Sequence, residues 1–427
     1  MRILVDSLNL GLSSGTGIAT YTENFIKNAV KCGHEVDLVL SSNGHYSKKA
    51  HRGVTLADAL TPAPEPGGIL RPVKLLYGEI RTCFAPRVNN IPLVNQEKFL
   101  PVRQAWQVPR LYRNAMMAFK HFDRFTELDI PGIDVAHWTS PLPVRVRNAI
   151  NIYTIHDMIP ATMPEFITGN IRLNRRLFRR IADIADFIFT VSENSKKDIV
   201  NFSSCDENKI INTYQTIEKY FWTPPSSVPA ALPDNLRNKG YFLFFGAVEP
   251  KKNVGRIIAA HRKANVTLPL VLVSSTGWGS QDVWKEIHDY CNEGNNRCIV
   301  MKYLPRHGLV NVIANAKSVV FPSLYEGFGL PVLEAMALGT PVIGSTAASL
   351  PEVIGDGGLL VDPLDTAALT QAMEQMEHVP GLADSLAEKG RRQANRFSPE
   401  AYRHRLSEAL TRCADQLRIS GHDQHSP

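Results

Sequence analysis

Residues 321–341 read FPSLYEGFGLPVLEAMALGTP, which predicts a buried strand, a glycine-rich loop and a helix in succession. Pro331 stands where the helix would begin, because proline is tolerated in the first helical turn, and Gly339 is placed to end it. The backbone N–H groups of Gly329 and Leu330 would then lie at a helix N-terminus, which is a common binding site for a phosphate.

Two glutamates accompany this loop. Glu326 lies within it, and we expect Glu334 in the first helical turn. Both carboxylates would then face the same binding site. Carboxylates beside a phosphate are suited to accept hydrogen bonds from sugar hydroxyls. The alternative is that Glu334 stabilises the helix dipole and Glu326 is a solvated loop residue. The flanking glycines and Pro331 favour the sugar-binding interpretation.

Outside this segment, buried strands alternate with helical stretches. In the second half of the chain, strands are expected at 241–245, 270–274, 298–302, 318–321, 341–344 and 359–361. In the first half they are expected at 2–5, 35–40, 135–138, 152–155 and 187–191. This alternation is typical of α/β proteins with doubly wound parallel sheets. Residues 42–124 lack a clear pattern, and we interpret them as loops and short helices of the first domain.

A proline-rich stretch, PPSSVPAALP at 224–233, separates the two halves and predicts a linker. We therefore expect two Rossmann-like domains, at 1–221 and 239–398, joined by a linker at 222–238. Residues 399–420 predict a final helix, and 421–427 predict a flexible tail.

Composition excludes several classes of protein. The 427 residues are 44% hydrophobic and 21% charged, so the chain is not mostly disordered. The chain has 47 Lys and Arg residues and 41 Asp and Glu residues, and this surplus of positive charge is too small to indicate a nucleic-acid partner. No apolar run is long enough to span a membrane, and no secretory signal is expected. Six cysteines without a CxxC pair predict reduced thiols in a cytoplasmic protein, not a zinc site.

A second segment, GAVEPKKN at 246–253, follows the first expected strand of the second domain. Lys251 and Lys252 could there neutralise the negative charge of a pyrophosphate. An ordinary solvated turn is the alternative. The position directly after a strand favours the first interpretation.

The first domain holds a third candidate, in which Gly15 and Gly17 open a helix that could also face a phosphate. A dinucleotide site is disfavoured, because Thr20 replaces the third glycine of GxGxxG and Ser41 and Ser42 stand where an acidic residue would bind the ribose. A purely structural tight turn remains the alternative.

His156 follows the strand expected at 152–155, at the edge where α/β sheets place ligands. It could donate a hydrogen bond to a sugar hydroxyl or to the acceptor, although a lone histidine is often structural. Ser192 could contact a phosphate or could cap a helix.

Together these segments resemble the GT-B glycosyltransferases of the retaining family 4 type. The donor motif of that family is an E-x7-E within EGFGLPxLEAMAxGTPVI, and the chain also matches its GxxEP(R/K)KN, GIGRYT and IHDxIP segments. The resemblance covers most of the chain. It implies a GT-B fold with two facing Rossmann-like domains, in which the C-terminal domain holds most of the nucleotide sugar and the final helix packs back on the N-terminal domain.

The resemblance also implies roles for individual residues. Glu326 would bind hydroxyls of the donor hexose, Glu334 the ribose and Lys252 the diphosphate. Catalysis would involve Glu326, His156 and Lys252. The implied donor-binding residues are Gly15, Gly17, Lys251, Lys252, Gly327, Phe328, Gly329, Leu330 and Glu334.

The chain departs from the family pattern at two places. Ala247 stands where many relatives carry an arginine, and we expect Lys251 to compensate. Tyr214 begins a Tyr-Gln-Thr run where relatives usually carry an Asn-Gly pair.

The implied reaction transfers a hexose with retention of configuration, and GDP-mannose is the favoured donor. The implied acceptor is a saccharide or undecaprenyl-diphosphate-linked acceptor of bacterial surface-polysaccharide synthesis. Because no Asp-x-Asp motif stands in a donor-site context, we expect no metal cofactor. A rhamnosyl or other hexosyl transferase using a dTDP-, GDP- or UDP-sugar, a sugar-nucleotide epimerase and a non-catalytic GT-B subunit remain alternatives.

A stripe of arginines offers a possible membrane contact. Positions 172, 175, 176, 179 and 180 are all arginine and share one face of an expected helix. Such a face could contact anionic lipid headgroups at the inner side of the cell membrane, or it could be simply solvated.

Overall fold

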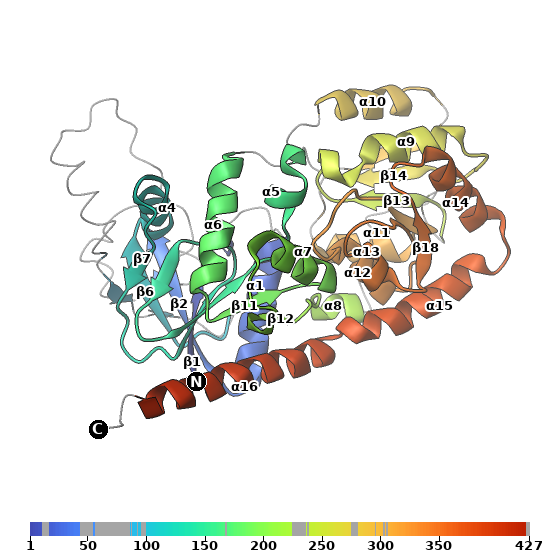
Figure 1. Cartoon of the computed structure of the whole chain (residues 1–427). Coiled ribbons are helices and arrows are strands. Elements are labelled where there is room, and N and C mark those ends of the chain that lie inside the picture. Colours follow the sequence, from blue (N-terminus) through green and yellow to red (C-terminus); the bar gives the residue numbers. More distant parts are fainter. Residues whose placement is uncertain are drawn as a thin grey trace. The chain divides into compact units, whose positions relative to one another are not determined.

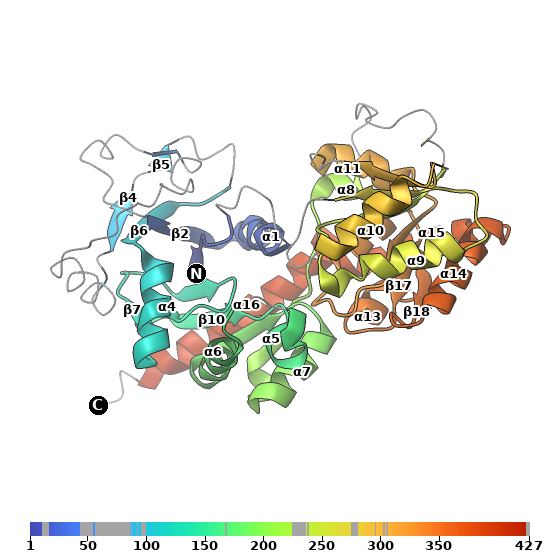
Figure 2. The ribbon, with the colours of Figure 1, turned by 90° about the horizontal axis from the view of Figure 1, so that it is seen from above.

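The computed structural model describes residues 1–10, 17–42, 54–55, 86, 88–91, 93–94, 100–166, 169–223, 236, 239–274, 281–294, 296–301, 304 and 306–423. Gly15, and all of the linker predicted at 222–238 except 222–223 and 236, lie outside this set. The chain forms two compact units (Figures 1 and 2). Unit 1 comprises residues 1–191, 196–213 and 402–427, and unit 2 comprises residues 192–195 and 214–401.

Unit 1 is built on an eight-stranded sheet that is parallel except at one edge strand. Its spatial order is β12 (Ile210–Asn212), β11 (Phe187–Thr190), β10 (Ile150–Thr154), β8 (Val135–Trp138), β1 (Arg2–Asp6), β2 (Glu35–Ser42), β6 (Gln104–Pro109) and the antiparallel β4 (Asn89–Ile91). Two further pairs are β3 (Val54–Thr55) with β5 (Leu93–Val94), and β7 (Thr126–Leu128) with β9 (Val144–Val146). Chain order reverses between β1 and β8, which makes that position the switch point of the sheet.

Different helices cover the two faces of this sheet (Figure 1). Leu4 of β1 packs in a core that includes residues of α4 (Leu111–Phe122) and α6 (Ile171–Ile184). Its neighbours Ile3 and Val5 pack in a second core with α1 (Gly17–Lys31) and α16 (Pro399–Asp423). The alternation follows from the two-residue period of a strand. The remaining helices of this part of the chain are α5 (Ile159–Thr162), η3 (Pro164–Phe166), α7 (Glu193–Ser203) and η4 (Glu207–Lys209).

The last helix completes the second of these cores. α16 contributes Tyr402, Leu406, Ala409, Leu410 and Cys413, each at most 1% exposed. The helix ends at Asp423, three residues beyond the boundary expected from the sequence.

One expectation for unit 1 was wrong. Within residues 42–124, interpreted from the sequence as loops and short helices, β6 pairs with β2 over six residues inside the main sheet. Its sequence, QAWQVP, alternates too little and contains two glutamines and a proline, so it does not resemble a buried strand. The antiparallel strand β4 and the 12-residue helix α4 also lie in this region.

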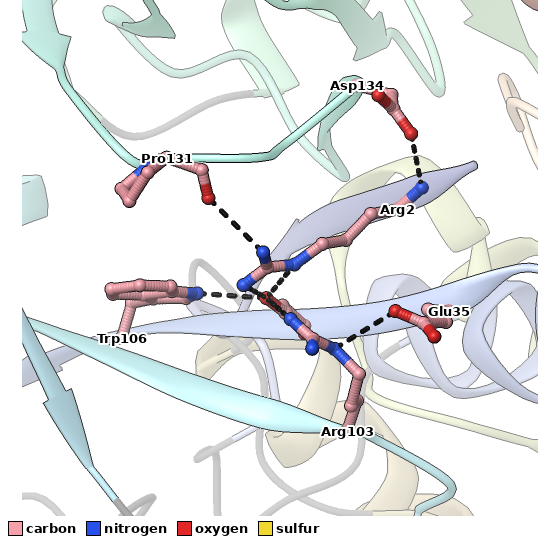
Figure 3. A network of polar contacts seen from close by, with 7 residues as sticks. Arg2, Glu35, Arg103, Trp106, Pro131 and Asp134 are labelled. Carbon is pink, nitrogen blue, oxygen red and sulfur yellow. Dashed lines mark hydrogen bonds and ion pairs between the residues drawn. The ribbon is translucent and has the colours of Figure 1, made fainter.

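A buried carboxylate ties these strands together at the amino edge of the sheet (Figure 3). Asp37 of β2 is 0% exposed and accepts hydrogen bonds from Arg2 Nε at 2.9 Å, Arg103 Nε at 3.1 Å and Trp106 Nε1 at 2.9 Å. Glu35 adds an exposed ion pair with Arg103 at 3.2 Å. The network joins β1, β2 and β6 at the edge opposite to the one where ligands bind.

Unit 2 contains a six-stranded, wholly parallel sheet. Its spatial order is β15 (Cys298–Met301), β14 (Leu270–Val273), β13 (Phe242–Phe245), β16 (Ser318–Phe321), β17 (Val342–Ser345) and β18 (Gly358–Val361). All six strands predicted for the second half of the chain are confirmed to within one residue at each end. The strand order is the 3-2-1-4-5-6 of doubly wound folds, with its switch point between β13 and β16.

Helices precede, connect and follow these strands. They are α8 (Lys219–Trp222), η6 (Pro250–Lys252), α9 (Val254–Lys263), α10 (Gln281–Cys291), α11 (Arg306–Ala314), α12 (Leu330–Ala337), α13 (Leu350–Ile354), α14 (Thr366–His378), α15 (Leu382–Ala394) and η7 (Asn395–Phe397).

Candidate functional site

Both predicted donor segments emerge at the switch point of unit 2. Gly246 directly follows β13, and the glycine-rich loop 322–329 directly follows β16. These two strands are neighbours in the sheet, and their parallel direction brings both segments to the carboxyl edge. In open α/β sheets the crevice beside the switch point is the place where ligands bind.

Hydrogen bonds join the two segments. The amide of Leu324 donates to the carbonyl of Lys251 at 2.8 Å, and the side-chain amide of Asn253 donates to the carbonyl of Pro322 at 3.1 Å. Lys251 Nζ also lies 3.5 Å from Glu326 Oε2. The two motifs, about 75 residues apart in the sequence, therefore form one site.

Lys252 lies against the first of these loops. Gly246 has φ of +123°, and a Cβ built there would be 2.9 Å from Lys252 Nζ. The ammonium also lies 5.7 Å from the centroid of the Phe321 ring, at the end of β16. The positive φ favours glycine at 246, and a side chain there would displace this ammonium. The ammonium is held over the ends of the two central strands.

Glu326 is held by its neighbours. Its side chain is 13% exposed, and Oε1 accepts a hydrogen bond from Ser323 Oγ at 3.2 Å. Its backbone carbonyl accepts one from Ser349 Oγ at 2.8 Å. Lys251, expected from the sequence to compensate for the missing arginine at 247, contacts this carboxylate. A carboxylate fixed in this way is preorganised to accept hydrogen bonds from hydroxyls.

The loop after Glu326 is fastened through its carbonyl groups. Ser195 Oγ donates to the carbonyl of Gly327 at 3.3 Å. The hydroxyl of Ser349 shares its one proton between the carbonyls of Glu326 and Phe328, the latter at 3.0 Å. Gly329 has φ of +102°, and a Cβ there would be 2.7 Å from Leu350 Cδ2. These carbonyl groups are therefore hydrogen-bonded within the protein. The backbone groups of the loop that can bind an anion are its N–H groups.

In the first turn of α12, few N–H groups are left to bind an anion. Val332 and Leu333 donate their N–H groups back to the carbonyl of Gly329, and Pro331 has no N–H. Leu330 thus supplies the N–H of the helix start. Glu334 lies in the second turn, not the first as expected, because the helix begins at Leu330. Its side chain is almost fully buried, at 7% exposed.

An aromatic cluster that sequence reasoning missed supports the loop from behind. The ring of Phe328 packs edge-on against Phe397 at 5.3 Å and lies 6.4 Å from the ring of Tyr214. Tyr214 adopts φ of +57°, a conformation that asparagine and glycine adopt more easily. Its ring contacts stabilise it there. The unusual residue at 214, noted as a departure from the family pattern, was the signal available in the sequence.

In unit 1, His156 lies at the carboxyl edge of the sheet, just beyond β10. Its Nε2 lies 2.8 Å from the carbonyl oxygen of Thr139, and its ring packs edge-on against Tyr21 of α1 at 4.8 Å. Burial lowers the pKa of His156 to about 4, so the ring is neutral at neutral pH. Gly17 is the first residue of α1.

Ser192 caps α7. Its Oγ accepts a hydrogen bond from the amide of Ser195 at 3.0 Å and donates one to Ser195 Oγ at 2.9 Å. The amides of Glu193 and Asn194 donate to the carboxylate of Glu352 at 3.1 and 3.3 Å. This helix N-terminus already holds an anionic side chain, so the capping interpretation of Ser192 fits the structure and the phosphate-contact interpretation does not.

The arginine stripe of α6 makes contacts within unit 1. Arg176 and Arg180 form ion pairs with Asp123 at 3.4 and 3.5 Å. Arg175 donates two hydrogen bonds to backbone carbonyls of α5, and Arg179 lies over an aromatic ring. Four of the five arginines thus have protein partners, which gives the stripe a structural role.

Metal ligands, membrane-spanning helices and cysteine pairing can be stated for the described residues. No group of three or more metal-ligating side chains occurs among them. None of their helices is long and apolar enough to cross a membrane. All five cysteines in this part of the chain are free, and the Cys291 thiol donates a hydrogen bond to Cys298 with 2.9 Å between the sulfurs.

Comparison with known families gives two matches along the chain. Residues 15–212 match the family described as Glycosyltransferase Family 4, and residues 233–393 match Glycosyl transferases group 1. The boundary between the matches falls in the proline-rich segment. The second match contains both loops of the switch-point site.

Two curated relatives are named as mannosyltransferases of Escherichia coli. O-antigen chain mannosyltransferase B is 32% identical over 266 residues, which cover 61% of this chain and 69% of that protein. Serotype-specific mannosyltransferase WbdA is 26% identical over 271 residues, 60% of this chain. The match spans only 33% of the length of WbdA.

Solved structures match the whole fold. Sucrose-phosphate synthase from Thermosynechococcus elongatus superimposes with a TM-score of 0.64 at 17% identity, over 98% of this chain and 99% of that one. The Anabaena protein HepE, solved in complex with UDP and glucose, gives 0.61 at 16% identity over 96% and 99%. These likenesses confirm the GT-B architecture expected from the sequence.

Proposed function

The chain belongs to the family 4 glycosyltransferases, and on that premise we propose that it transfers a mannosyl group from a nucleoside diphosphate donor to a saccharide acceptor in bacterial surface-polysaccharide synthesis. The observation that carries this proposal is the switch-point site of unit 2. There a fixed carboxylate, an ammonium and the start of a helix lie on two hydrogen-bonded loops.

Each part of this site suits one part of a nucleotide sugar. Glu326 accepts hydrogen bonds from hydroxyls of the hexose, and the buried Glu334 accepts them from the ribose. Lys252 and the N–H of Leu330 bind the diphosphate, since a cation and a helix N-terminus both stabilise an anion. Neither glutamate needs to form a bond to the sugar.

We propose GDP-mannose as the donor, because both E. coli relatives are named mannosyltransferases. The base-binding loop expected at 302–305 lies outside the described residues except for Leu304. HepE binds UDP, so a uridine donor is the first alternative to test. A rhamnosyl donor carried on dTDP or GDP is the second.

The transfer proceeds with retention of configuration and without a metal ion. As the bond between the anomeric carbon and the phosphate oxygen breaks, negative charge develops on the departing diphosphate, and Lys252 and the helix start stabilise it. The same phosphate accepts the proton of the attacking hydroxyl on the front face of the sugar. Preorganised cations can supply this stabilisation where other enzymes use a divalent metal.

The acceptor is a saccharide, or a saccharide linked to undecaprenyl diphosphate, and the enzyme works in the cytoplasm at the inner face of the membrane. The exposed side of α6 supports a peripheral contact with anionic lipids, through arginines such as Arg172, Arg176 and Arg179, which are exposed. The protein partners of Arg176 and Arg179 weaken this contact, so it would need further basic residues.

Thermal unfolding with GDP, UDP, dTDP, ADP and NAD, each with and without magnesium, tests the donor. A ligand that binds only the native state raises Tm. We expect a shift with GDP that does not depend on magnesium and is lost in Lys252→Ala. Lys263→Ala is the matched control, because Lys263 lies exposed at the end of α9.

Turnover assays then separate the remaining possibilities. Radiolabelled mannose from GDP-mannose should appear in an acceptor oligosaccharide, and Glu326→Ala should abolish transfer while leaving Tm almost unchanged. Epimerised donor without any acceptor would indicate an epimerase. Failure of every nucleoside diphosphate to raise Tm would indicate a non-catalytic subunit, and a shift with NAD alone would overturn the transferase assignment.

A further inference from the structure

Two cysteines of unit 2 meet at the amino edge of its sheet, opposite to the loops that follow β13 and β16. Cys291 is the last residue of α10, and Cys298 is the first residue of β15. The Cys291 thiol donates a hydrogen bond to Cys298, with 2.9 Å between the two sulfur atoms. A disulfide bond is about 2.05 Å long, so a small movement of either side chain would bring the sulfurs to bonding distance.

The fold holds the Cys291 side of this pair in place. Its neighbour Tyr290 is buried, and the Tyr290 hydroxyl lies 2.6 Å from Nδ1 of His261 in α9. The other ring nitrogen of His261 lies 2.9 Å from the carbonyl oxygen of Leu268, to which it can only donate. The hydroxyl of Tyr290 therefore donates to Nδ1 in the neutral ring. The end of α10 is thus fixed against α9.

The Cys298 side is fixed through the residue before it. The carbonyl of Arg297 accepts a hydrogen bond from the amide of Leu270 at 2.8 Å, and Cys298 pairs with Leu270 in the ladder of β14 and β15. The Arg297 guanidinium donates to backbone carbonyls at the end of α9 and just beyond it (His261, Ala264 and Val266). Both sulfur atoms are therefore held in contact by anchored neighbours.

The two thiols differ in their access to solvent. Cys291 is half-buried, whereas Cys298 is 5% exposed. Burial raises the pKa of the Cys298 thiol, which disfavours the thiolate that would attack a dissolved oxidant. Cys291 is therefore the thiol that a reagent in solution reaches first.

No other cysteine in the described part of the chain has a sulfur partner of this kind. The thiols of Cys32, Cys205 and Cys413 lie near backbone carbonyl oxygens, at 3.9, 3.7 and 3.3 Å. Cys205 is half-buried like Cys291, so it has comparable access to solvent without a second sulfur beside it.

We propose that Cys291 and Cys298 form a redox modification site, in which Cys291 reacts with a dissolved disulfide such as oxidised glutathione and Cys298 resolves the product. The Cys291 thiolate attacks one sulfur of oxidised glutathione, which gives a mixed disulfide and releases one glutathione. Cys298 then loses its proton and attacks the Cys291 sulfur, which releases the second glutathione. The pair loses two electrons and two protons, and oxidised glutathione gains them as two reduced molecules.

The crosslink would change the stability of one edge of unit 2. Among the described residues, β15 is an edge strand that pairs only with β14. A bond between Cys291 and Cys298 would join this strand to the end of α10 and oppose its local opening. In reducing surroundings the two thiols remain separate, so the stability of this edge would follow the redox state. This inference does not depend on the proposed function.

Thiol mapping by mass spectrometry tests the order of the two steps in the folded, full-length protein treated with oxidised glutathione. The wild type should give the Cys291–Cys298 crosslink, which dithiothreitol should reverse. Cys298→Ser should stop at glutathione on Cys291, with at least about tenfold more mixed disulfide there than in the wild type, because an adjacent thiol reacts as an intramolecular group. In Cys291→Ser, Cys298 should react at least about tenfold more slowly than Cys291 does in Cys298→Ser.

Two variants guard this experiment against trivial results. Cys205→Ser is the matched control, because it removes a half-buried thiol that has no neighbouring sulfur, and the crosslink should form as in the wild type. If the buried hydroxyl of Cys298→Ser prevents folding, Cys298→Ala removes the same sulfur with an apolar side chain and should give the same mixed disulfide.

Hydrogen exchange measures the effect on the sheet. In the crosslinked wild type, we expect the amides of β15 to exchange at least about threefold more slowly than in the reduced protein, because the crosslink opposes local opening. Cys298→Ser treated with the same oxidant should show no such change.

Three results would overturn the inference. The first is a folded wild type that keeps glutathione on Cys291 and forms no crosslink. The second is Cys298 reacting with glutathione faster than Cys291 does. The third is a crosslink that appears only after the protein is unfolded in urea, since the folded structure would then not bring the sulfurs together. Unchanged exchange of β15 in crosslinked protein would refute the effect on the sheet edge.

Discussion

Replacing Asp37 by alanine should destabilise unit 1 by about 4 kcal/mol. The change leaves three donor side chains without their acceptor, and these side chains differ in access to water. The indole N–H of Trp106 is buried, and leaving it unpaired costs about 1–2 kcal/mol. Arg2 is 20% exposed and Arg103 is 39% exposed, so water can replace part of their bonds, and together they add about 2–3 kcal/mol.

Glu35→Ala provides the control within the same network. Glu35 pairs with Arg103 at 3.2 Å but is 63% exposed, and an exposed pair contributes about 0–1 kcal/mol. Urea unfolding followed by far-UV circular dichroism measures both variants, and Tm should fall by roughly 8–16 °C in Asp37→Ala. If Asp37→Ala shifted the urea midpoint no more than Glu35→Ala, the buried carboxylate would not be what holds the amino edge together.

Three further outcomes can be checked. Burial lowers the pKa of three histidines, to about 3 in one and about 4 in the others (His137, His156 and His261). Their neutral forms stabilise the fold fully above pH 6.5, and this stability is lost as pH falls toward 4, because the unfolded chain then binds more protons than the folded one. The urea midpoint should therefore fall between pH 6.5 and pH 4. A urea midpoint that does not change across this range would contradict the prediction. Gly329→Ala should weaken binding of the nucleoside diphosphate by more than about tenfold and lower Tm, because it adds both a strained φ and a clash with Leu350. In the control Gly381→Ala, φ is also positive but the space is open, so Tm should fall only slightly. Equal effects of the two variants on nucleotide binding would contradict a role of the 322–329 loop in binding. Oxidised glutathione should join Cys291 and Cys298 by thiol–disulfide exchange with loss of two hydrogens, which mass spectrometry detects, and no crosslink should form in Cys298→Ser.

The sheet of unit 2 could be predicted from the sequence because its strands are continuous apolar runs. Residues 242–245 read FLFF and 270–273 read LVLV, and both strands lie in the interior of a parallel sheet, with a strand on each side. Runs of this length that are rich in aromatic and β-branched residues are typical of fully buried strands.

Unit 1 was harder to predict because several of its strands are short and mixed in composition. β6 reads QAWQVP, and only its pairing with β2 makes it a strand. The three-residue strands β7 and β9 pair only with each other, outside the main sheet. In these elements tertiary contacts override local propensity, so a single sequence does not indicate them.

The candidate site also has a part that the sequence indicated and a part that it did not. The residue types in loops 246–253 and 322–329 indicated their chemistry directly, and the structure brings those loops together. The contact of Ser195 with Gly327 and the contact of Tyr214 with Phe328 each join two separate segments. No local pattern reports such pairs, because each depends on the order of the strands.

The course of α16 has a consequence for how the protein is made. Residues from Tyr402 onward belong to unit 1, whereas the preceding 214–401 belong to unit 2. During synthesis the strands β1 and β2 leave the ribosome before unit 2, yet the face that Tyr402, Leu406 and Leu410 cover stays open until α16 is complete. Unit 1 therefore closes its core only after unit 2 has been translated, and unit 2 can finish folding while unit 1 still exposes an apolar face.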